Sequence, residues 1–137
     1  MTPKRAEKIK SVLAQRQTGL TLIADRVHKG RNLAAMVRTC DAVGIGNIHA
    51  VLSSDELRPF RGTAMGSNQW VDIKIHPDID HAIDDVKQQK MQLLVADIKT
   101  DDQGSCAFDQ VDFTRPTALL MGSENKGVSD IGRQQAD

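Results

Sequence analysis

The apolar and polar positions of this chain follow two alternating patterns. Segments in which apolar residues recur every three or four positions predict helices, because those positions share one helical face. They cover residues 4–16, 32–43 and 78–90, and another helix is expected to start after Ser129. Short apolar or alternating runs with β-branched residues predict strands, namely residues 20–24, 47–52, 69–75, 91–96 and 117–121.

This alternation of strands and helices predicts an α/β sandwich with a mainly parallel sheet, because each parallel crossover needs a covering helix. The 137 residues suffice for a single domain, residues 1–137, with a core of its own. Ligands of such sheets bind at the carboxyl ends of the strands. The loops after residues 24, 96 and 121 are therefore the expected places for a site.

Two residues mark the limits of the helix over residues 32–43. Asn32 stands where an N-cap is expected, since its side chain can accept a hydrogen bond from a free backbone N–H. Gly44 follows the last apolar position and is expected to end the helix in a left-handed conformation. The small and polar residues 53–67 predict a loop with one or two short helical turns.

The net charge is zero, but the charges are divided unequally along the chain. Residues 1–61 contain 11 Lys and Arg against 5 Asp and Glu, whereas residues 62–137 contain 7 against 13. The basic half opens with a predicted basic helix within residues 1–17, which could bind phosphate groups. Charge alone favours the simpler alternative, a solvated helix face.

Several common kinds of site find no support in the sequence. There is no dinucleotide fingerprint after a strand and no Walker A spacing. Cys40 and Cys106 are far apart and lack neighbouring ligands, so neither a disulfide nor a zinc site is expected. The four histidines form no local ligand pattern, so surface or capping positions are expected for them and no metal is expected. No apolar run is long enough to span a membrane, and a cytoplasmic location is expected.

Two segments place candidate chemistry beside turns that follow predicted strands. The first contains Asn32 and Arg38, which are less than two helical turns apart and can approach the same rim of the sheet. The second leads from an apolar strand into the loop Gly122–Gly127, which contains Glu124. Each segment alone is explained as well by a capped helix with a surface arginine, or by a solvated glycine turn.

Together and in this order, the two segments resemble motifs one and two of the SpoU family of RNA methyltransferases, N-x-x-A-x-x-R-T and [LIV]-x-G-x-E-x-x-G. The likeness runs along the whole chain and points to the TrmH branch, as in residues 27–29, 41–44, 66–71 and 114–117. It implies a SPOUT-type (α/β knot) fold, S-adenosyl-L-methionine as cofactor, and a homodimer with its active site at the subunit interface. It also implies tRNA as substrate, methylated on the ribose 2'-hydroxyl of the D-loop guanosine at position 18.

The resemblance further implies roles for individual residues. Arg38 would be the central catalytic residue, as a partner for phosphate and for the developing oxyanion, because arginine is too basic to act as an ordinary base. Asn32 would hold Arg38 or the target ribose, and Glu124 would order its loop and the arginine. The expected cofactor contacts are Ala96, Met121 and Gly122. The expected RNA contacts on the basic helix are Arg5, Lys8 and Arg16.

A third motif of the family, N-x-S-x-A, does not occur before Asp137. The chain is therefore expected to be incomplete at its C-terminus and to lack the segment that forms the knot. Two alternatives remain open. One is a ribosomal RNA 2'-O-methyltransferase of the same family, which differs in its target. The other is a non-catalytic RNA-binding or dimerisation remnant.

Overall fold

The computed structural model describes residues 1–53, 69–98 and 104–137. In these ranges the chain forms a five-stranded sheet in the order β3-β2-β1-β5-β4, with all neighbouring strands parallel. The strands are β1 (Leu20–Val27), β2 (Asn47–Leu52), β3 (Asp72–His76), β4 (Gln92–Ala96) and β5 (Thr117–Met121). The predicted α/β class with a parallel sheet is confirmed. The turns expected in residues 53–67 lie, apart from Ser53, outside the described residues.

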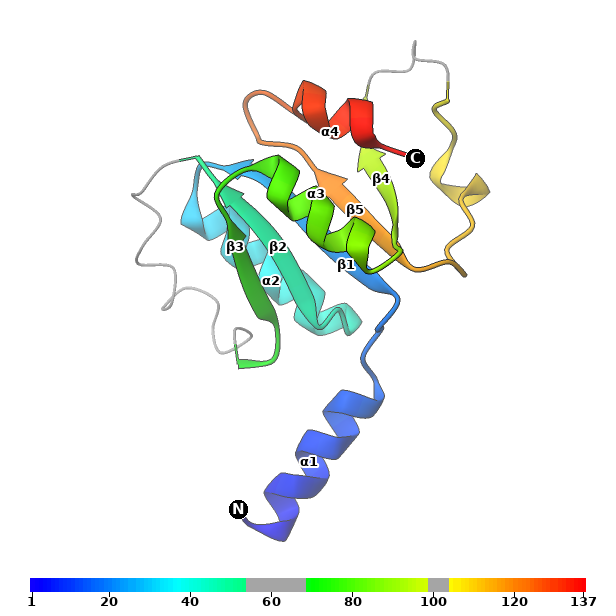
Figure 1. Ribbon diagram of the computed structural model, residues 1–137. Helices are drawn as coiled ribbons and strands as arrows, with labels where there is room; N and C mark the ends of the chain where they lie inside the picture. Colours follow the sequence, from blue (N-terminus) through cyan, green and yellow to red (C-terminus); the bar gives the residue numbers. More distant parts are fainter. Residues whose placement is uncertain (54–68, 99–103) are drawn as a thin grey trace.

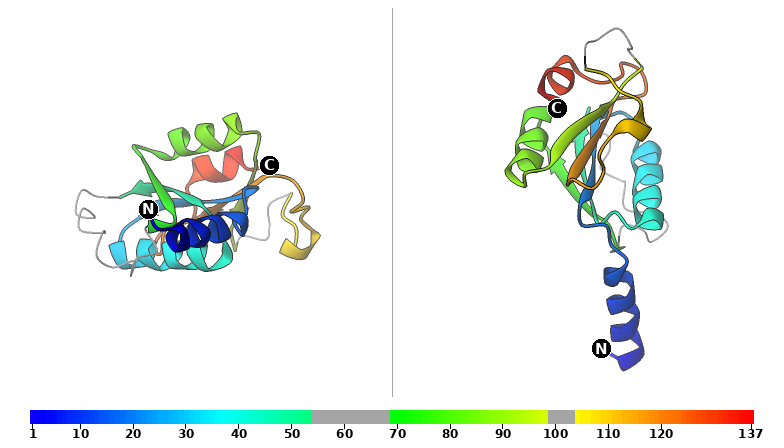
Figure 2. Two further views of the ribbon diagram at one scale, coloured as in Figure 1. Left: turned by 90° about the horizontal axis from the view of Figure 1, so that it is seen from below. Right: turned by 90° about the vertical axis from the view of Figure 1, so that its right-hand side faces the viewer.

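Helices cover both faces of this sheet (Figures 1 and 2). One face carries α2 (Gly30–Val43), and the other carries α3 (Ile79–Gln88) and the short α4 (Asp130–Gln135). A 3-10 turn, η4 (Phe108–Gln110), precedes β5. The N-terminal α1 (Pro3–Ala14) projects away from the sheet and buries none of its residues. None of the helices in the described ranges has the length and apolar character needed to cross a membrane.

Each face of the sheet has its own apolar core, as the helical patterns predict. On one face, Leu33 and Val37 of α2 pack with residues of β1 and β2. On the other, Ile83 and Val86 of α3 pack with apolar residues of four strands, among them Leu120. Strands that are buried on both faces have nearly continuous apolar sequences, which explains why four of the five residues of β5 are apolar.

The strand order creates a switch point between β1 and β5. The two strands pair from Leu20 with Thr117 to Ala24 with Met121, so their carboxyl ends lie side by side. After β1 the chain passes to α2 on one face, whereas after β5 it passes to α4 on the other. Such a divergence opens the crevice in which parallel sheets bind ligands.

Three local expectations were wrong, and one is confirmed. β1 does not end at residue 24 but continues to Val27 through an irregularity in its pairing with β2. α2 begins at Gly30, before Asn32, with Lys29 as N-cap and no side-chain cap bond, so Asn32 lies inside the first turn and its side chain bonds to Glu124. His49 lies neither at the surface nor in a cap, since it is completely buried. Gly44 does end α2 in the left-handed region, with φ of 82°.

The core on the α3 face yields a direct test of the fold. Ile83→Ala should lower the free energy of unfolding by about 3 kcal/mol, because it removes buried methyl groups and leaves a cavity. Ile98→Ala is the matched control, since Ile98 is 94% exposed and its truncation should change stability by less than about 0.5 kcal/mol. Urea unfolding of both variants measures the difference. Equal effects would contradict the packing described here.

Candidate functional site

A single side-chain hydrogen bond joins the two sequence motifs. The amide Nδ2 of Asn32, in the first turn of α2, donates to Oε1 of Glu124 in the loop after β5. The residues are 92 positions apart in the chain and meet because β1 and β5 are neighbours in the sheet. This hydrogen bond lowers the pKa of Glu124 below its ordinary value, against a smaller opposing effect of burial. The carboxyl group is therefore held ionised beside the amide.

The loop that carries Glu124 is a tight turn with little freedom. The backbone N–H of Ser123 donates to the carbonyl of Gly127 and the reverse bond forms as well, both at 2.9 Å. The hydroxyl of Ser123 also accepts from the N–H of Lys126 at 3.1 Å. Gly127 has φ of 66°, and a Cβ on Gly122 would lie 2.2 Å from the carbonyl carbon of Gly127. Gly122 is therefore required by the close approach of the chain, and the positive φ of Gly127 favours glycine there.

Asp25 and Arg26, which the sequence analysis did not select, brace this loop from β1. The buried carboxylate of Asp25 accepts from the N–H of Ser129 at 3.0 Å and pairs with Nε of Arg26 at 3.4 Å. Arg26 donates to the carbonyl of Gly127 at 3.2 Å and has a positive φ of 52°. The available signal was a pair of charges directly after an apolar strand, at the end where sites form.

Two of the expected cofactor contacts are direct neighbours in the sheet. Ala96 and Met121 are register partners at the carboxyl ends of β4 and β5, and Gly122 follows immediately. A largely apolar groove runs beside this edge and includes Ala96, Phe108 and Arg133 in its lining. The Arg133 guanidinium forms an ion pair with Asp97 at one end of the groove. A largely apolar groove with a charged pair in its lining suits a ligand that has both apolar and polar parts.

Arg38 lies further along α2 than Asn32, by between one and two helical turns, at an exposed position. Its guanidinium is therefore carried by the middle of α2, the helix whose first turn contains Asn32. No observation on this chain tests its catalytic role, which stays a prediction, as do the roles of Asn32 and Glu124.

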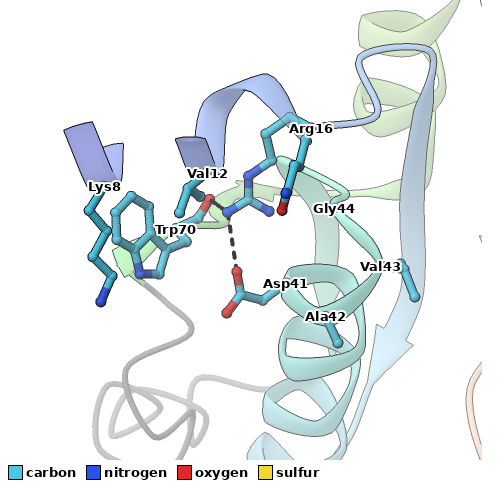
Figure 3. Close-up of a pocket in the computed structure, with 9 residues that line it drawn as sticks. Lys8, Val12, Arg16, Asp41, Ala42, Val43, Gly44 and Trp70 are labelled. Carbon is cyan, nitrogen blue, oxygen red and sulfur yellow. Dashed lines mark hydrogen bonds and ion pairs between the residues drawn. The ribbon is translucent and has the colours of Figure 1, made fainter. Parts of the chain in front are cut away.

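The three expected RNA contacts are in different environments. Arg5 and Lys8 are exposed on α1. Arg16, in contrast, is only 8% exposed and ties α1 to the body of the domain (Figure 3). It donates to the carbonyls of Ile45 and Trp70 at 3.1 and 2.8 Å and pairs with Asp41 at 3.2 Å. The sequence did not reveal this structural role, because the partners come from distant segments.

Figure 3 shows a pocket around this anchor, lined by α1, the end of α2 and Trp70. It lies at the amino ends of the strands, since Gly44 precedes β2 and Arg16 precedes β1. The motif loops are at the opposite, carboxyl edge. Parallel sheets bind substrates and cofactors at that edge, so this pocket is not the candidate site.

The contact between Asn32 and Glu124 predicts a dependence of stability on pH. Because the folded pKa of Glu124 lies below its ordinary value of 4.5, its contribution is complete above that value and is lost as the pH falls through the lowered one. Unfolding free energies measured from pH 6 down to 3 should therefore fall more steeply for the unaltered chain than for Glu124→Gln. Asn32→Ala should flatten the pH dependence of the unfolding free energy in the same way. If the unaltered chain and both variants gave parallel curves, the hydrogen bond between Asn32 and Glu124 would be contradicted.

Comparison with known proteins agrees with this geometry. A family model described as the SpoU rRNA Methylase family matches residues 19–137. The chain is 39% identical, over its entire length, to a tRNA (guanosine(18)-2'-O)-methyltransferase from Escherichia coli K12, and it spans 58% of the length of that relative.

Solved structures show the same likeness. The A. aeolicus TrmH/SpoU tRNA modifying enzyme superimposes with a TM-score of 0.84 at 32% identity, covering 98% of this chain and 67% of that one. The SpoU methyltransferase AviRb from Streptomyces viridochromogenes, in complex with the cofactor AdoMet, gives a TM-score of 0.73 at 25% identity, covering 85% and 47%. Both motifs, the parallel sheet and these likenesses agree, and the chain belongs to the SpoU rRNA Methylase family.

Proposed function

We propose that the protein transfers a methyl group from S-adenosyl-L-methionine to the ribose 2'-hydroxyl of guanosine 18 in tRNA. The observation that carries this proposal is the hydrogen bond between Asn32 and Glu124, which unites the two motifs at the carboxyl ends of β1 and β5. The substrate is taken from the relatives that match the full length of the chain and are named for this reaction.

The groove beside β4 and β5 supports the choice of cofactor. Ala96, which lines the groove, and its register partner Met121 would hold the cofactor by apolar contact, and the backbone of Gly122 would bound the site where β5 ends. When bound, the cofactor supplies an electrophilic methyl group on a sulfonium centre. The residues of the chain would orient the ribose towards it, since positioning accounts for much of the rate of such transfers.

Arg38 is the proposed catalytic residue. A ribose 2'-hydroxyl becomes a useful nucleophile only as it loses its proton, and negative charge then develops on its oxygen. The planar guanidinium of Arg38 can donate to that oxygen and to a neighbouring phosphate, which lowers the energy of the charged state. The hydrogen bond between Asn32 and Glu124 would keep the motif-two loop, Gly122–Gly127, in place against α2 during the reaction.

The proposal includes a homodimer with the site at the subunit interface, a single domain over residues 1–137, and a cytoplasmic location, where tRNA is modified. Arg5 and Lys8 on the projecting α1 would bind tRNA phosphates. Arg16 is not included among these contacts, because its guanidinium is engaged in the ion pair with Asp41 and in two backbone hydrogen bonds.

The alternative substrate is ribosomal RNA, which the description of the matching family names. Unmodified tRNA and 23S rRNA transcripts, incubated with the intact protein and radiolabelled S-adenosyl-L-methionine, distinguish the two. Label should enter tRNA and be lost when guanosine 18 is replaced by adenosine. Label in ribosomal RNA alone would favour the alternative. Absence of both labelling and cofactor binding would leave a non-catalytic RNA-binding module.

Substitution of Arg38 tests its role. Arg38→Ala should lower kcat for methyl transfer by about 100-fold or more, the usual effect of removing one donor to a developing oxyanion. Arg38→Lys should restore only part of the rate, because lysine lacks the planar fork of donors. Arg115→Ala removes an exposed arginine before β5 and should leave kcat unchanged. Near-normal turnover by Arg38→Ala would overturn the assignment.

The role of α1 is testable through the effect of salt. Phosphate contacts release counterions, so tRNA binding should weaken steeply as salt rises. Replacing both Arg5 and Lys8 by Ala should reduce the slope of log K against log salt concentration by about 2, or about 1 for each cation. Arg115→Ala again serves as the control. An unchanged slope in the double variant would exclude α1 as a phosphate-binding surface.

A further inference from the structure

Three potential metal ligands meet on the α3 face of the sheet, away from the motif loops. His49 lies in β2, His76 ends β3, and Asp85 lies in α3. Because β2 and β3 pair in parallel with Val51 opposite His76, both histidines extend from the same face of neighbouring strands. Their nitrogen atoms and a carboxylate oxygen of Asp85 all lie within 4.8 Å of one another.

The distances within this group are close to those of a metal site. Nδ1 of His49 lies 2.9 Å from Nε2 of His76 and 3.6 Å from Oδ2 of Asp85, and the third side of the triangle is 4.0 Å. The point equidistant from the three atoms lies in their plane, about 2.1 Å from each, so a tetrahedral ion requires the two histidine nitrogens to separate slightly and the Asp85 oxygen to move closer. Zinc bonds to imidazole nitrogen and carboxylate oxygen have this length, about 2.0–2.2 Å.

We propose that His49, His76 and Asp85 bind a zinc ion that ties the edge strand β3 to α3. Two imidazoles and one carboxylate form a ligand set that zinc accepts, and water can complete the tetrahedron. Water can reach the fourth coordination position from the side of Asp85, whose side chain is 32% exposed, but not from the side of His49, which is fully buried. The ion would link β2, β3 and α3.

The protonation state of the histidines supports this site. Burial lowers the pKa of His49 to about 4 and also lowers that of His76, so both rings are neutral at neutral pH. A neutral imidazole offers a lone pair to a metal, whereas a protonated one cannot. On zinc binding, the ring that donates the hydrogen bond between His49 and His76 would transfer its proton to its other nitrogen, so no net proton is released. If that ring is His49, the proton comes to Nε2, a buried atom without a hydrogen-bond partner.

In the metal-free structure the same atoms take part in other contacts. The two histidines share a hydrogen bond, and Nζ of Lys74 lies 3.4 Å from Oδ2 of Asp85. Zinc would replace the hydrogen bond and would require the ammonium group to turn away. The Lys74 side chain is 40% exposed, so solvent can receive it. Its positive charge weakens zinc binding, and its removal should strengthen it.

The test is a zinc titration of the intact protein carrying Cys106→Ser, which removes an exposed thiol that could bind zinc. Calorimetry should show one equivalent bound, and zinc at a hundred times Kd should raise Tm by roughly 5–10 °C. Cobalt in place of zinc should give the intense visible absorption of a tetrahedral site. Absence of saturable binding would overturn the proposal.

Variants locate the bound ion. His76→Gln and Asp85→Asn should each weaken zinc binding at least about 100-fold, whereas Lys74→Gln should strengthen it by up to about fivefold, the size of an exposed ion pair. His81→Gln is the matched control, because His81 is an exposed histidine of the same helix that bonds to Asp78 instead. Binding that survives in both His76→Gln and Asp85→Asn would place the ion elsewhere and refute the site.

Discussion

The parallel pairing of β1 with β5 is the constraint on which the rest of the site depends. Because these strands are adjacent, parallel and in register, two segments about a hundred residues apart in the chain both end at the carboxyl edge of the sheet. The chain leaves that edge towards α2 after β1 and towards α4 after β5. A crevice results, and Asn32 and Glu124 reach across it to form their hydrogen bond.

Several weaker contacts hold the motif-two loop in the shape that this bond requires. Paired backbone hydrogen bonds close the loop, and Gly122 is compelled to be a glycine by the nearness of Gly127. Asp25 and Arg26 fix the far side of the loop from the irregular end of β1. Of the buried carboxylate of Asp25, Oδ2 accepts a hydrogen bond from Ser129, whereas Oδ1 has only the ion pair with Arg26, so compensation for the loss of water is partial. The loop is therefore ordered from both neighbouring strands.

The two ends of the sheet are specialised differently. The carboxyl edge carries the motifs and the groove beside Ala96, whereas the amino edge carries the anchor formed by Arg16 with Asp41 and Trp70. This anchor explains how α1 can project while burying no residue of its own.

The sequence by itself determined the class of fold, the order of strands and helices and the identity of the two motifs, because these depend on local periodicity and on residues close together in the chain. It located Gly44 and the whole of β5 correctly for the same reason. It did not predict the N-cap of α2, the burial of Arg16 or the burial of His49, because the polar groups of Asn32, Arg16 and His49 could be satisfied either locally or by distant partners. Only the tertiary structure decided between these, by bringing Glu124, Asp41 and His76 within hydrogen-bonding or ion-pairing reach. Periodicity records which face of an element is buried, but the partner of a buried polar group is set by which strands become neighbours.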